Sequence, residues 1–398
     1  MKVFIATETD QRGTFATMLM IYNKLKELGI ESKIFTTFKS TYNVLPDPPK
    51  GIKGYESAVN SSEYAEKVLK IMNPDRNTVI HIANAMHGLI PIAEKLGAKT
   101  LINIQYWWPV CYFNSMDNPD CDCKSFSKIS NCIAKKKGGV RAIFSPLETI
   151  YALRKLDRIR ENVSKASMIL AVSNIVKDIL VERSFPEEKI RIININALSP
   201  PIQYVDYYPS DYFTFAYLSY PDEGKGVFQL VKAFYLASKK NPKIRLKIPG
   251  GLEEPKLVSL VEGLNLTNKV IMTGRLPYAE YVKVIPEILK DVDVVVVPTL
   301  VPDTWARVVT ESMLSGRPVI VTKGNGALVE QVTDMIDGFH VNVYSLEEFA
   351  SSLYKVSLLS RETIKQMGIL ARENILRKYD NNKIMGDLLM AYKELIEI

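Results

Sequence analysis

The sequence predicts an α/β protein made of two similar domains, each with a parallel sheet covered by helices on both faces. Short β-branched apolar runs alternate with segments of helical period along most of the 398 residues. The alternation breaks once, at residues 196–210, where ALSPPIQYVDYYPS contains three prolines and no period. It then resumes, and the last fifty or so residues have helical period only. A break between two alternating halves is typical of an interdomain linker.

The first half begins with KVFIAT, an apolar run of strand length. The helix that follows ends at Gly29, because glycine adopts the left-handed conformation that terminates helices. The expected strands here are 2–7, 32–37, 78–83, 100–104, 168–172 and 190–195. The expected helices are 14–28, 64–72, 89–96, 146–163 and one that Ser173 caps. Residues 1–200 therefore form the first predicted domain.

The second half repeats the pattern. Its expected strands are 213–218, 244–250, 269–274, 292–297, 319–322 and 338–341. Its expected helices are 227–238, 280–289, one after Glu254 and one after Pro302. A helical tail covers 345–359, 361–379 and 382–398. Residues 201–379 form the second predicted domain, and about 380–398 form a separate C-terminal helix.

Composition excludes several classes of protein. The apolar fraction of 47% is that of a soluble globular protein, and no apolar run approaches the roughly 20 residues of a membrane span. The start MKVFIATETD is typical of a first strand rather than a signal peptide, so we expect a cytoplasmic protein. A net charge of +7 is far short of a nucleic-acid-binding protein. The Lys, Ile and Glu content hints at a thermophilic source.

Basic residues concentrate in one segment, residues 135–160. Such a cluster is either a solvated face or a surface that meets anionic lipid headgroups or a phosphate-bearing acceptor. The second interpretation predicts a peripheral contact with the cytoplasmic face of a membrane.

All four cysteines also lie in one segment, with the spacing C-x9-C-x-C-x8-C. This spacing lacks the C-x2-C pairs of ordinary zinc ribbons. A Cys-ligated metal such as structural zinc and one or two disulfides remain equally open, with free thiols a third alternative. In each case the cysteines would stabilise a loop, and they are Cys111, Cys121, Cys123 and Cys132.

The most informative stretch is VVVVPTLVPDTWARVVTESMLSGRPVI, residues 294–320. Its apolar run predicts a strand buried on both faces, and prolines then force a loop. Asp303 lies in that loop and Glu311 lies eight residues later on the following helix. The loop follows the carboxyl end of a parallel strand, where doubly wound folds bind ligands. The helix start suits a phosphate group, because its N–H groups and dipole favour anions.

The pattern of an acid, seven residues and Glu, then small-Gly-x-Pro-Val-Ile, resembles the signature of retaining GT-B glycosyltransferases, particularly family 4. Trp305, Ala306 and Asp303 stand where that family has Phe, Gly and Glu. The resemblance implies the GT-B fold: two Rossmann-like domains, a deep interdomain cleft and a C-terminal helix that crosses back to the first domain. The alternative is a strand–loop–helix unit whose acids are merely solvated.

The resemblance also implies residue roles. Glu311 would accept hydrogen bonds from the nucleotide ribose, as a carboxylate can from a vicinal diol. Asp303 would bind a hydroxyl of the donor sugar. Backbone N–H groups of Trp305 and Ala306 would hold the sugar or the phosphate. The donor would be a nucleotide sugar such as a UDP- or GDP-sugar.

Two glycines flank Lys225 in the turn after residues 213–218. Gly224 and Gly226 let the backbone approach a diphosphate, and the lysine adds a positive charge. The turn resembles the family's Arg-Leu-x-x-x-Lys-Gly donor loop, although its Arg position falls near Leu218 or Ser219. A second cation must therefore come from elsewhere, and the candidates are Arg307 and Arg275.

Further donor-binding candidates surround this core. The segment KGNGALVEQV resembles the family's Gly-Gly-x-x-Glu turn, with an asparagine between the glycines. The turn after the first strand, TDQRGT, offers a single glycine where the family has two. The remaining candidates are Gly274, Gly324, Gly326, Glu330 and Gly13.

In the first domain INIQYWWPVC resembles the family's His-Asp-x-Trp-Pro-x-Cys, with Gln105 and Tyr106 in place of His and Asp. A conventional general base is absent there, which fits the family's route in which the leaving phosphate takes the acceptor proton. Gln105 would donate a hydrogen bond to the acceptor or phosphate. His81, at the end of a strand, is either a further catalytic candidate or a structural histidine.

The sequence thus predicts a metal-independent, retaining glycosyltransferase of the hexosyltransferase type. No Asp-x-Asp lies in a fitting place for a metal, and the acids at 120–122, which have that spacing, lie inside the cysteine segment. The acceptor would be a glycan or lipid-linked molecule. The alternatives are a catalytically inactive sugar-nucleotide-binding scaffold protein and another GT-B enzyme such as a nucleotide-sugar epimerase.

Overall fold

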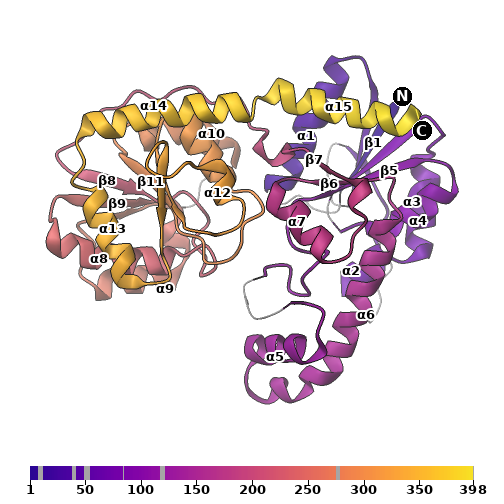
Figure 1. The fold of residues 1–398 in the computed structure, drawn as a ribbon, viewed down its shortest axis with the longest axis horizontal. Coiled ribbons are helices and arrows are strands. Elements are labelled where there is room, and N and C mark those ends of the chain that lie inside the picture. Colours follow the sequence, from indigo (N-terminus) through magenta and orange to yellow (C-terminus); the bar gives the residue numbers. More distant parts are fainter. Residues whose placement is uncertain are drawn as a thin grey trace. The chain divides into compact units, whose positions relative to one another are not determined.

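The chain folds into two compact units, each described here by itself. The computed structural model describes residues 1–7, 12–37, 42–48, 54–83, 85–116, 122–274 and 278–397. Unit 1 comprises Met1–Leu198 together with Asn381–Ile398, and unit 2 comprises Ser199–Asp380. Each unit contains one parallel sheet between helices, so the α/β class with two Rossmann-like domains is confirmed (Figure 1).

Unit 1 contains a sheet that has seven strands in the described residues, in the order β3-β2-β1-β4-β5-β6-β7. The paired strands are parallel, and Ile5 of β1 lies between Ile34 of β2 and His81 of β4. The strands are β1 (Lys2–Thr7), β2 (Glu31–Thr36), β3 (Asn43–Val44), β4 (Thr78–Ala83), β5 (Lys99–Ile104), β6 (Met168–Ala171) and β7 (Ile190–Ile192). Its longer helices are α1 (Arg12–Glu27), α2 (Gly54–Val59), α3 (Ser62–Met72), α4 (Ile90–Lys95), α5 (Phe126–Lys137), α6 (Ser145–Ser164), α7 (Asn174–Glu182) and α15 (Asn381–Glu397).

Unit 2 contains a parallel sheet of six strands in the described residues, in the order β10-β9-β8-β11-β12-β13. The strands are β8 (Phe213–Ala216), β9 (Ile244–Ile248), β10 (Val270–Met272), β11 (Val294–Val297), β12 (Val319–Thr322) and β13 (Gly338–Val341). The helices are α8 (Val227–Lys240), α9 (Pro255–Gly263), α10 (Tyr278–Leu289), α11 (Arg307–Leu314), α12 (Leu328–Gln331), α13 (Leu346–Val356) and α14 (Arg361–Lys378).

The unbroken apolar strands of unit 2 are explained by two separate cores. Successive side chains of a strand point to opposite faces of the sheet. Val294 and Val296 accordingly pack in one core with Phe234 of α8, whereas Val295 and Val297 pack in the other. Because helices cover both faces, every residue of β11 is buried and none needs to be polar.

Helix α15 is joined to the sheet of unit 1 through a buried histidine. The Nδ1 atom of His81 lies 2.6 Å from the Tyr392 hydroxyl, and its Nε2 lies 2.8 Å from Oδ1 of Asn103. All three side chains are buried. Since Oδ1 of Asn103 can only accept, Nε2 carries the proton and the tyrosine hydroxyl donates to Nδ1. Burial lowers the pKa of His81 from 6.5 to about 4 and so keeps the ring neutral.

This histidine predicts an acid-sensitive stability. Below its ordinary pKa of 6.5 the unfolded chain binds a proton, whereas folded His81 does not until the pH reaches about 4. The stability of the chain should therefore fall as the pH falls through that window, by about 2 kcal/mol between pH 7 and pH 5 from His81 alone. Urea titrations at the two pH values measure this loss.

The matched variant for that titration is His81→Gln, which cannot titrate. It should unfold more easily at pH 7, because two buried hydrogen bonds change, but it should lose less stability on going to pH 5. An equal loss in wild type and variant would contradict the assignment of a neutral, buried His81. His87 is also buried and contributes a loss in the same direction in both proteins, since burial lowers its pKa to about 3.

The structure contains elements that the sequence analysis missed. Helix α5 overlaps the end of the cysteine segment, where the sequence predicts a loop, and its buried Ile129, Cys132 and Ile133 follow helical spacing. The short strand β3 and helices α2 and α12 were also not predicted. None of the helices in the described part of the chain has both the length and the apolar character that a bilayer crossing requires.

Candidate functional site

The site lies in unit 2, where the direction of strand succession in the sheet reverses. From β8 the chain proceeds outward through β9 and β10, then returns to β11 on the other side of β8 and continues through β12 and β13. Such a reversal leaves the loops after the two central strands side by side, and a ligand fits between them. These loops follow β8 and β11, and they carry Lys225 and Asp303.

The loop after β8 is held against the end of β11 by its glycines. The backbone O of Gly224 accepts from the N–H of Leu300 at 2.8 Å. Gly226 has φ +75°, and a Cβ there would lie 1.9 Å from the backbone O of Pro298. The side chain of Asp222 stabilises the turn by accepting from the N–H of Gly224 at 2.8 Å. Glycine is therefore required at 226, because the residue has a positive φ and packs closely against the backbone of Pro298.

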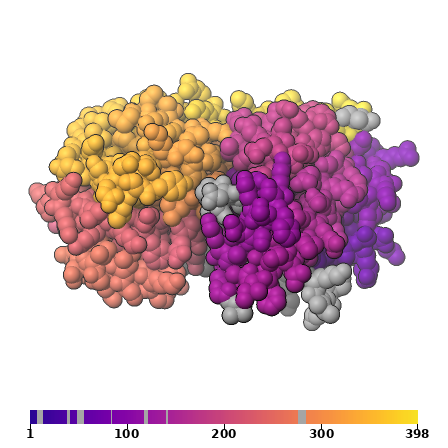
Figure 2. Space-filling view, turned by 60° about the horizontal axis from the view of Figure 1, so that its bottom comes forward, coloured from indigo at the N-terminus to yellow at the C-terminus, as the bar shows by residue number. Residues whose placement is uncertain are grey.

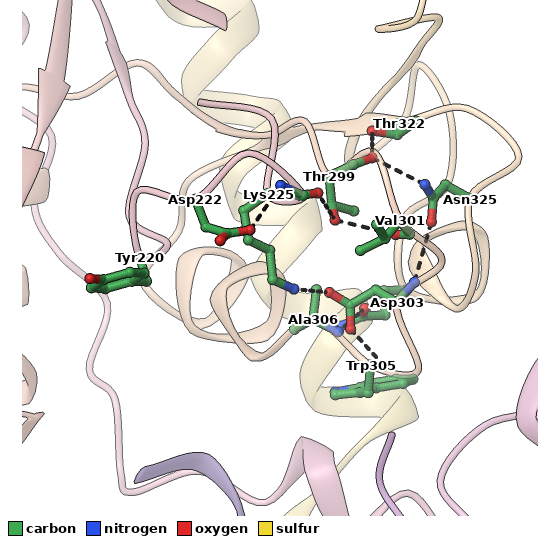
Figure 3. A network of polar contacts seen from close by, with 12 residues as sticks. Tyr220, Asp222, Lys225, Thr299, Val301, Asp303, Trp305, Ala306, Thr322 and Asn325 are labelled. Carbon is green, nitrogen blue, oxygen red and sulfur yellow. Dashed lines mark hydrogen bonds and ion pairs between the residues drawn. The ribbon is translucent and has the colours of Figure 1, made fainter. Parts of the chain in front are cut away.

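Lys225 and Asp303 form an ion pair across the two loops, with Nζ 2.7 Å from Oδ2 (Figure 3). The lysine side chain is 39% exposed and the aspartate side chain 12% exposed. The carboxylate raises the pKa of Lys225 above its ordinary value, against the opposing effect of burial. The lysine is thus firmly cationic, and its exposure leaves the charge within reach of a bound anion.

A third loop, after β12, fixes the position of Asp303. Oδ1 of Asn325 lies 3.3 Å from the N–H of Asp303, and Nδ2 of Asn325 donates to the backbone O of Thr299 at 3.0 Å (Figure 3). Gly326 has φ +53°, and a Cβ there would lie 2.2 Å from the backbone O of Asp303. That same oxygen accepts from the N–H of Ala327 at 2.8 Å. The three loops therefore position the ion pair together.

The backbone N–H groups of Trp305 and Ala306 both have hydrogen-bond acceptors within the protein. The N–H of Trp305 lies 3.2 Å from Oδ1 of Asp303, and the N–H of Ala306 donates to Oε1 of Gln331 at 3.1 Å. Nε2 of Gln331 in turn donates a hydrogen bond to the backbone O of Ala306 at 3.0 Å. Both N–H groups thus already have protein acceptors. They orient Asp303 and anchor the start of α11, which does not fit the expected direct role in holding a sugar or phosphate.

Helix α11 places Glu311 one turn after its start and eight residues after Asp303, with its side chain 6% exposed. An oxygen of its carboxylate lies 3.6 Å from NH2 of Arg307, one turn earlier on the same helix. Arg307 was a candidate for a second cation at the diphosphate. In the structure this guanidinium lies beside Glu311, whereas Nζ of Lys225 lies beside Asp303.

Four further donor-binding candidates lie in three regions of the described chain. Gly324 has φ +68° with open space around it, and Glu330 lies in α12, both in the region after β12. Gly274 follows β10, the edge strand of the sheet, and Arg275 lies outside the described residues. Gly13 lies in the first turn of α1 in unit 1.

The first-domain candidates lie in unit 1. Gln105 is buried and directly follows β5. His81 is fully buried, with both ring nitrogens hydrogen-bonded to Tyr392 and Asn103. This geometry favours the structural alternative for His81, because a general base must reach its substrate. The signal for this role was available, since His81 lies within a strand flanked by apolar residues.

The three described cysteines are buried, and no disulfide links any of them to another of the three. Cys111 and Cys123 interact, and this contact together with backbone N–H groups of Phe113, Ser115 and Met116 lowers the pKa of Cys111 to about 6. Cys121 lies outside the described residues. The disulfide alternative therefore does not apply to Cys111, Cys123 and Cys132 among themselves. The described residues contain no group of three or more His, Cys, Asp or Glu side chains arranged for a metal ion.

Sequence reasoning missed Asp222, Asn325 and Gln331, which hold the three loops in place. Asp222 accepts from the N–H of Gly224, two residues later. Asn325 and Gln331 act through hydrogen bonds to backbone groups far away in the chain, such as the N–H of Ala306, which precedes Gln331 by 25 residues. No local spacing encodes such a bond. Asn325 did stand out as the residue that separates Gly324 from Gly326, and its amide is what ties Thr299 to Asp303.

Substitution of Gly226 tests how closely the loop must approach β11. Gly226→Ala should cost more than about 1 kcal/mol of stability, because alanine disfavours φ +75° and its Cβ would clash with Pro298. The shifted loop would also misplace Lys225, and we expect the rate of the predicted sugar transfer to fall about 100-fold. The control is Gly263→Ala in α9, where a Cβ meets open space. Thermal unfolding of both variants measures the difference, and equal midpoints would contradict the packing described for the loop.

Comparison with known proteins finds a family match over part of the chain. Residues 208–373 match the model of the family described as glycosyl transferases group 1. The match covers most of unit 2, including Lys225, Asp303 and Glu311. The resemblance to group 1 GT-B glycosyltransferases is thus confirmed, whereas membership of family 4 stays a prediction. No protein of curated function matches the chain by sequence.

Solved structures show that the likeness extends over the whole fold. A glycosyltransferase from Rickettsia africae has 17% identity and a TM-score of 0.69, over 99% of this chain and 98% of that one. Sucrose-phosphate synthase from Thermosynechococcus elongatus has 15% identity and a TM-score of 0.69, over 100% and 99% of the two chains. HepE from Anabaena, in complex with UDP and glucose, has 15% identity and a TM-score of 0.67, over 99% and 100%. At these identities the likeness concerns the fold.

Proposed function

We propose that the protein is a retaining glycosyltransferase of the hexosyltransferase type, which moves a sugar from a nucleoside diphosphate sugar to a glycan or lipid-linked acceptor. The family match and the fold support a nucleotide-sugar glycosyltransferase. HepE, which shares the fold, was crystallised with UDP-glucose. By analogy a UDP- or GDP-sugar is the proposed donor, bound by unit 2, and the acceptor is proposed to bind unit 1.

The observation that carries this proposal is the ion pair between Lys225 and Asp303 at the point where strand succession reverses. A cation and a hydrogen-bond acceptor 2.7 Å apart suit two neighbouring parts of one ligand. The lysine would meet the diphosphate, and the aspartate would meet a sugar hydroxyl. Glu311, further along α11, would accept hydrogen bonds from the ribose.

The proposed chemistry uses the charge of Lys225 on the leaving group. In the transition state the bond between the anomeric carbon and the diphosphate oxygen breaks, and negative charge develops on that oxygen. A fixed ammonium group near this oxygen stabilises the charge without solvent reorganisation. The acceptor hydroxyl forms the new bond to the anomeric carbon, and its proton passes to the departing diphosphate on the same face. This route retains the anomeric configuration and needs no protein base at Gln105 or His81.

A panel of UDP- and GDP-sugars, offered with simple glycoside and lipid-linked acceptors, tests the proposal. We expect release of nucleoside diphosphate with one of the two bases, and NMR of the product should show the anomeric configuration of the donor. An inverted product would overturn the retaining mechanism. Binding of a nucleotide sugar without transfer or hydrolysis for every donor would instead favour an inactive binding protein.

A further inference from the structure

A helical projection of unit 1 exposes apolar side chains on its outer side. We call it the arm and define it as α5 (Phe126–Lys137), the 3-10 helix η2 (Gly139–Phe144) and the start of α6 (Ser145–Ser164). Figure 1 shows α5 and the start of α6 extending away from the sheet of unit 1. Figure 2, which turns that side forward, shows this part of the chain at the surface.

The arm has its own small core, and its exposed apolar residues are separate from that core. Ile129 and Ile133 of α5 pack with Ala152 of α6, and all three are buried. A second apolar set follows helical spacing on the opposite side. Its members are Ile143, Phe144, Leu147 and Ile150, which are 73%, 60%, 68% and 43% exposed. Leu147 and Ile150 are three residues apart and lie on one face of α6, and Ile143 and Phe144 lie at the end of η2, which leads directly into α6. We call these four exposed side chains the stripe.

A basic border accompanies the stripe. Lys135, Lys136 and Lys137 form the last turn of α5, and all three are exposed. Lys137 forms an ion pair with Glu148, the residue after Leu147, so the end of α5 lies next to the stripe. Lys136 donates to Oγ of Ser115 and lies over the ring of Phe113. Residues 135–150 contain four basic residues and one acid. The result is an apolar surface next to a positively charged one.

We propose that the arm docks on an anionic lipid surface, with the stripe entering the headgroup region and the lysines contacting lipid phosphates. An apolar face bordered by cations is the arrangement that interfacial helices use. A second copy of the chain fits less well, because it would bring two lysine clusters of the same sign together. Four apolar side chains are also far fewer than the roughly 20 residues per side of a stable protein interface. The proposal is independent of the transferase reaction.

Vesicle co-sedimentation without nucleotide tests the arm. The probes are phosphatidylcholine vesicles with and without roughly a third of phosphatidylglycerol. The wild-type protein should bind the anionic vesicles at least about tenfold more tightly than the neutral ones, and the difference should shrink at high salt. Equal binding to the two kinds of vesicle, or no binding to either, would overturn the proposal.

Two variants assign the binding to the arm. Ile143→Gln combined with Leu147→Gln should weaken anionic-vesicle binding about tenfold or more, because it removes the apolar contact. Lys135→Gln combined with Lys136→Gln should weaken it to a similar extent. The matched control is Ile71→Gln with Leu96→Gln, which removes exposed apolar residues elsewhere on unit 1.

Circular dichroism and thermal unfolding establish that each variant is folded, which is expected because the substituted side chains are exposed. If the arm variants bind as tightly as the control, the proposal is wrong. A dimer of the wild type that the stripe variant dissociates, with no vesicle binding, would also overturn it and would identify the stripe as an interface between copies.

Discussion

Replacing Lys225 with methionine should lower the rate of sugar transfer by about a thousandfold. The reason is that Lys225 is the cation of the loop after β8, where it lies beside Asp303 and is exposed enough to meet a diphosphate. Stability should change by less than about 1 kcal/mol, because an ion pair with a 39% exposed lysine is strongly screened by water. Steady-state kinetics with the best donor measures the first effect, and thermal unfolding measures the second.

The control for this prediction is Lys256→Met, which removes an exposed lysine of α9. It should leave the rate unchanged, which excludes a general effect of charge. A Lys225→Met enzyme that retains more than about a tenth of the wild-type rate would remove the lysine from the proposed mechanism. A large loss of stability together with activity would instead assign Lys225 a role in holding the loops.

Substituting Glu311 with glutamine should weaken nucleotide binding by about a hundredfold, since hydrogen bonds to a charged group are among the stronger ones. The substitution keeps the shape of the side chain but removes the negative charge that faces both Arg307 and the proposed ribose. Thermal-shift titration with UDP and GDP measures the effect, because a ligand that binds the folded state raises the apparent stability.

The matched variant for Glu311 is Glu262→Gln, an exposed acid on α9, which should leave the titration unchanged. Arg307→Gln separates the two contributions that Glu311 makes. It should destabilise the fold near α11, where the carboxylate would lose its cation, and it should weaken nucleotide binding less than Glu311→Gln does. Nucleotide binding that is unaffected by Glu311→Gln would refute the placement of the ribose on α11.

Much of the fold followed from periodicity. The apolar run that ends at Val297 and the alternation of strand and helix on both sides of residues 196–210 were sufficient for two parallel sheets. The observed ends of several helices and strands differ by a few residues from the predicted ends, because capping interactions set them. Helix α5 was not predicted because only Ile129, Cys132 and Ile133 are buried in this otherwise polar segment, so its helical spacing is short.

The site was predictable only in part. Lys225, Asp303 and Glu311 lie on loops or helices that directly follow parallel strands, so topology places them at one edge of the sheet. The hydrogen bonds of Asn325 and Gln331 were not predictable, because they join segments that meet only in the folded chain. The burial of His81 likewise depends on Tyr392, 311 residues away.

A crystal structure with bound UDP or GDP tests the central claim most directly. The account predicts the diphosphate within hydrogen-bonding distance of Nζ of Lys225 and the ribose hydroxyls at the carboxylate of Glu311. The carboxylate of Asp303 should lie next to the terminal phosphate, where the sugar begins. A nucleotide bound elsewhere, or bound here with Glu311 turned away from the ribose and Lys225 away from the phosphates, would contradict it.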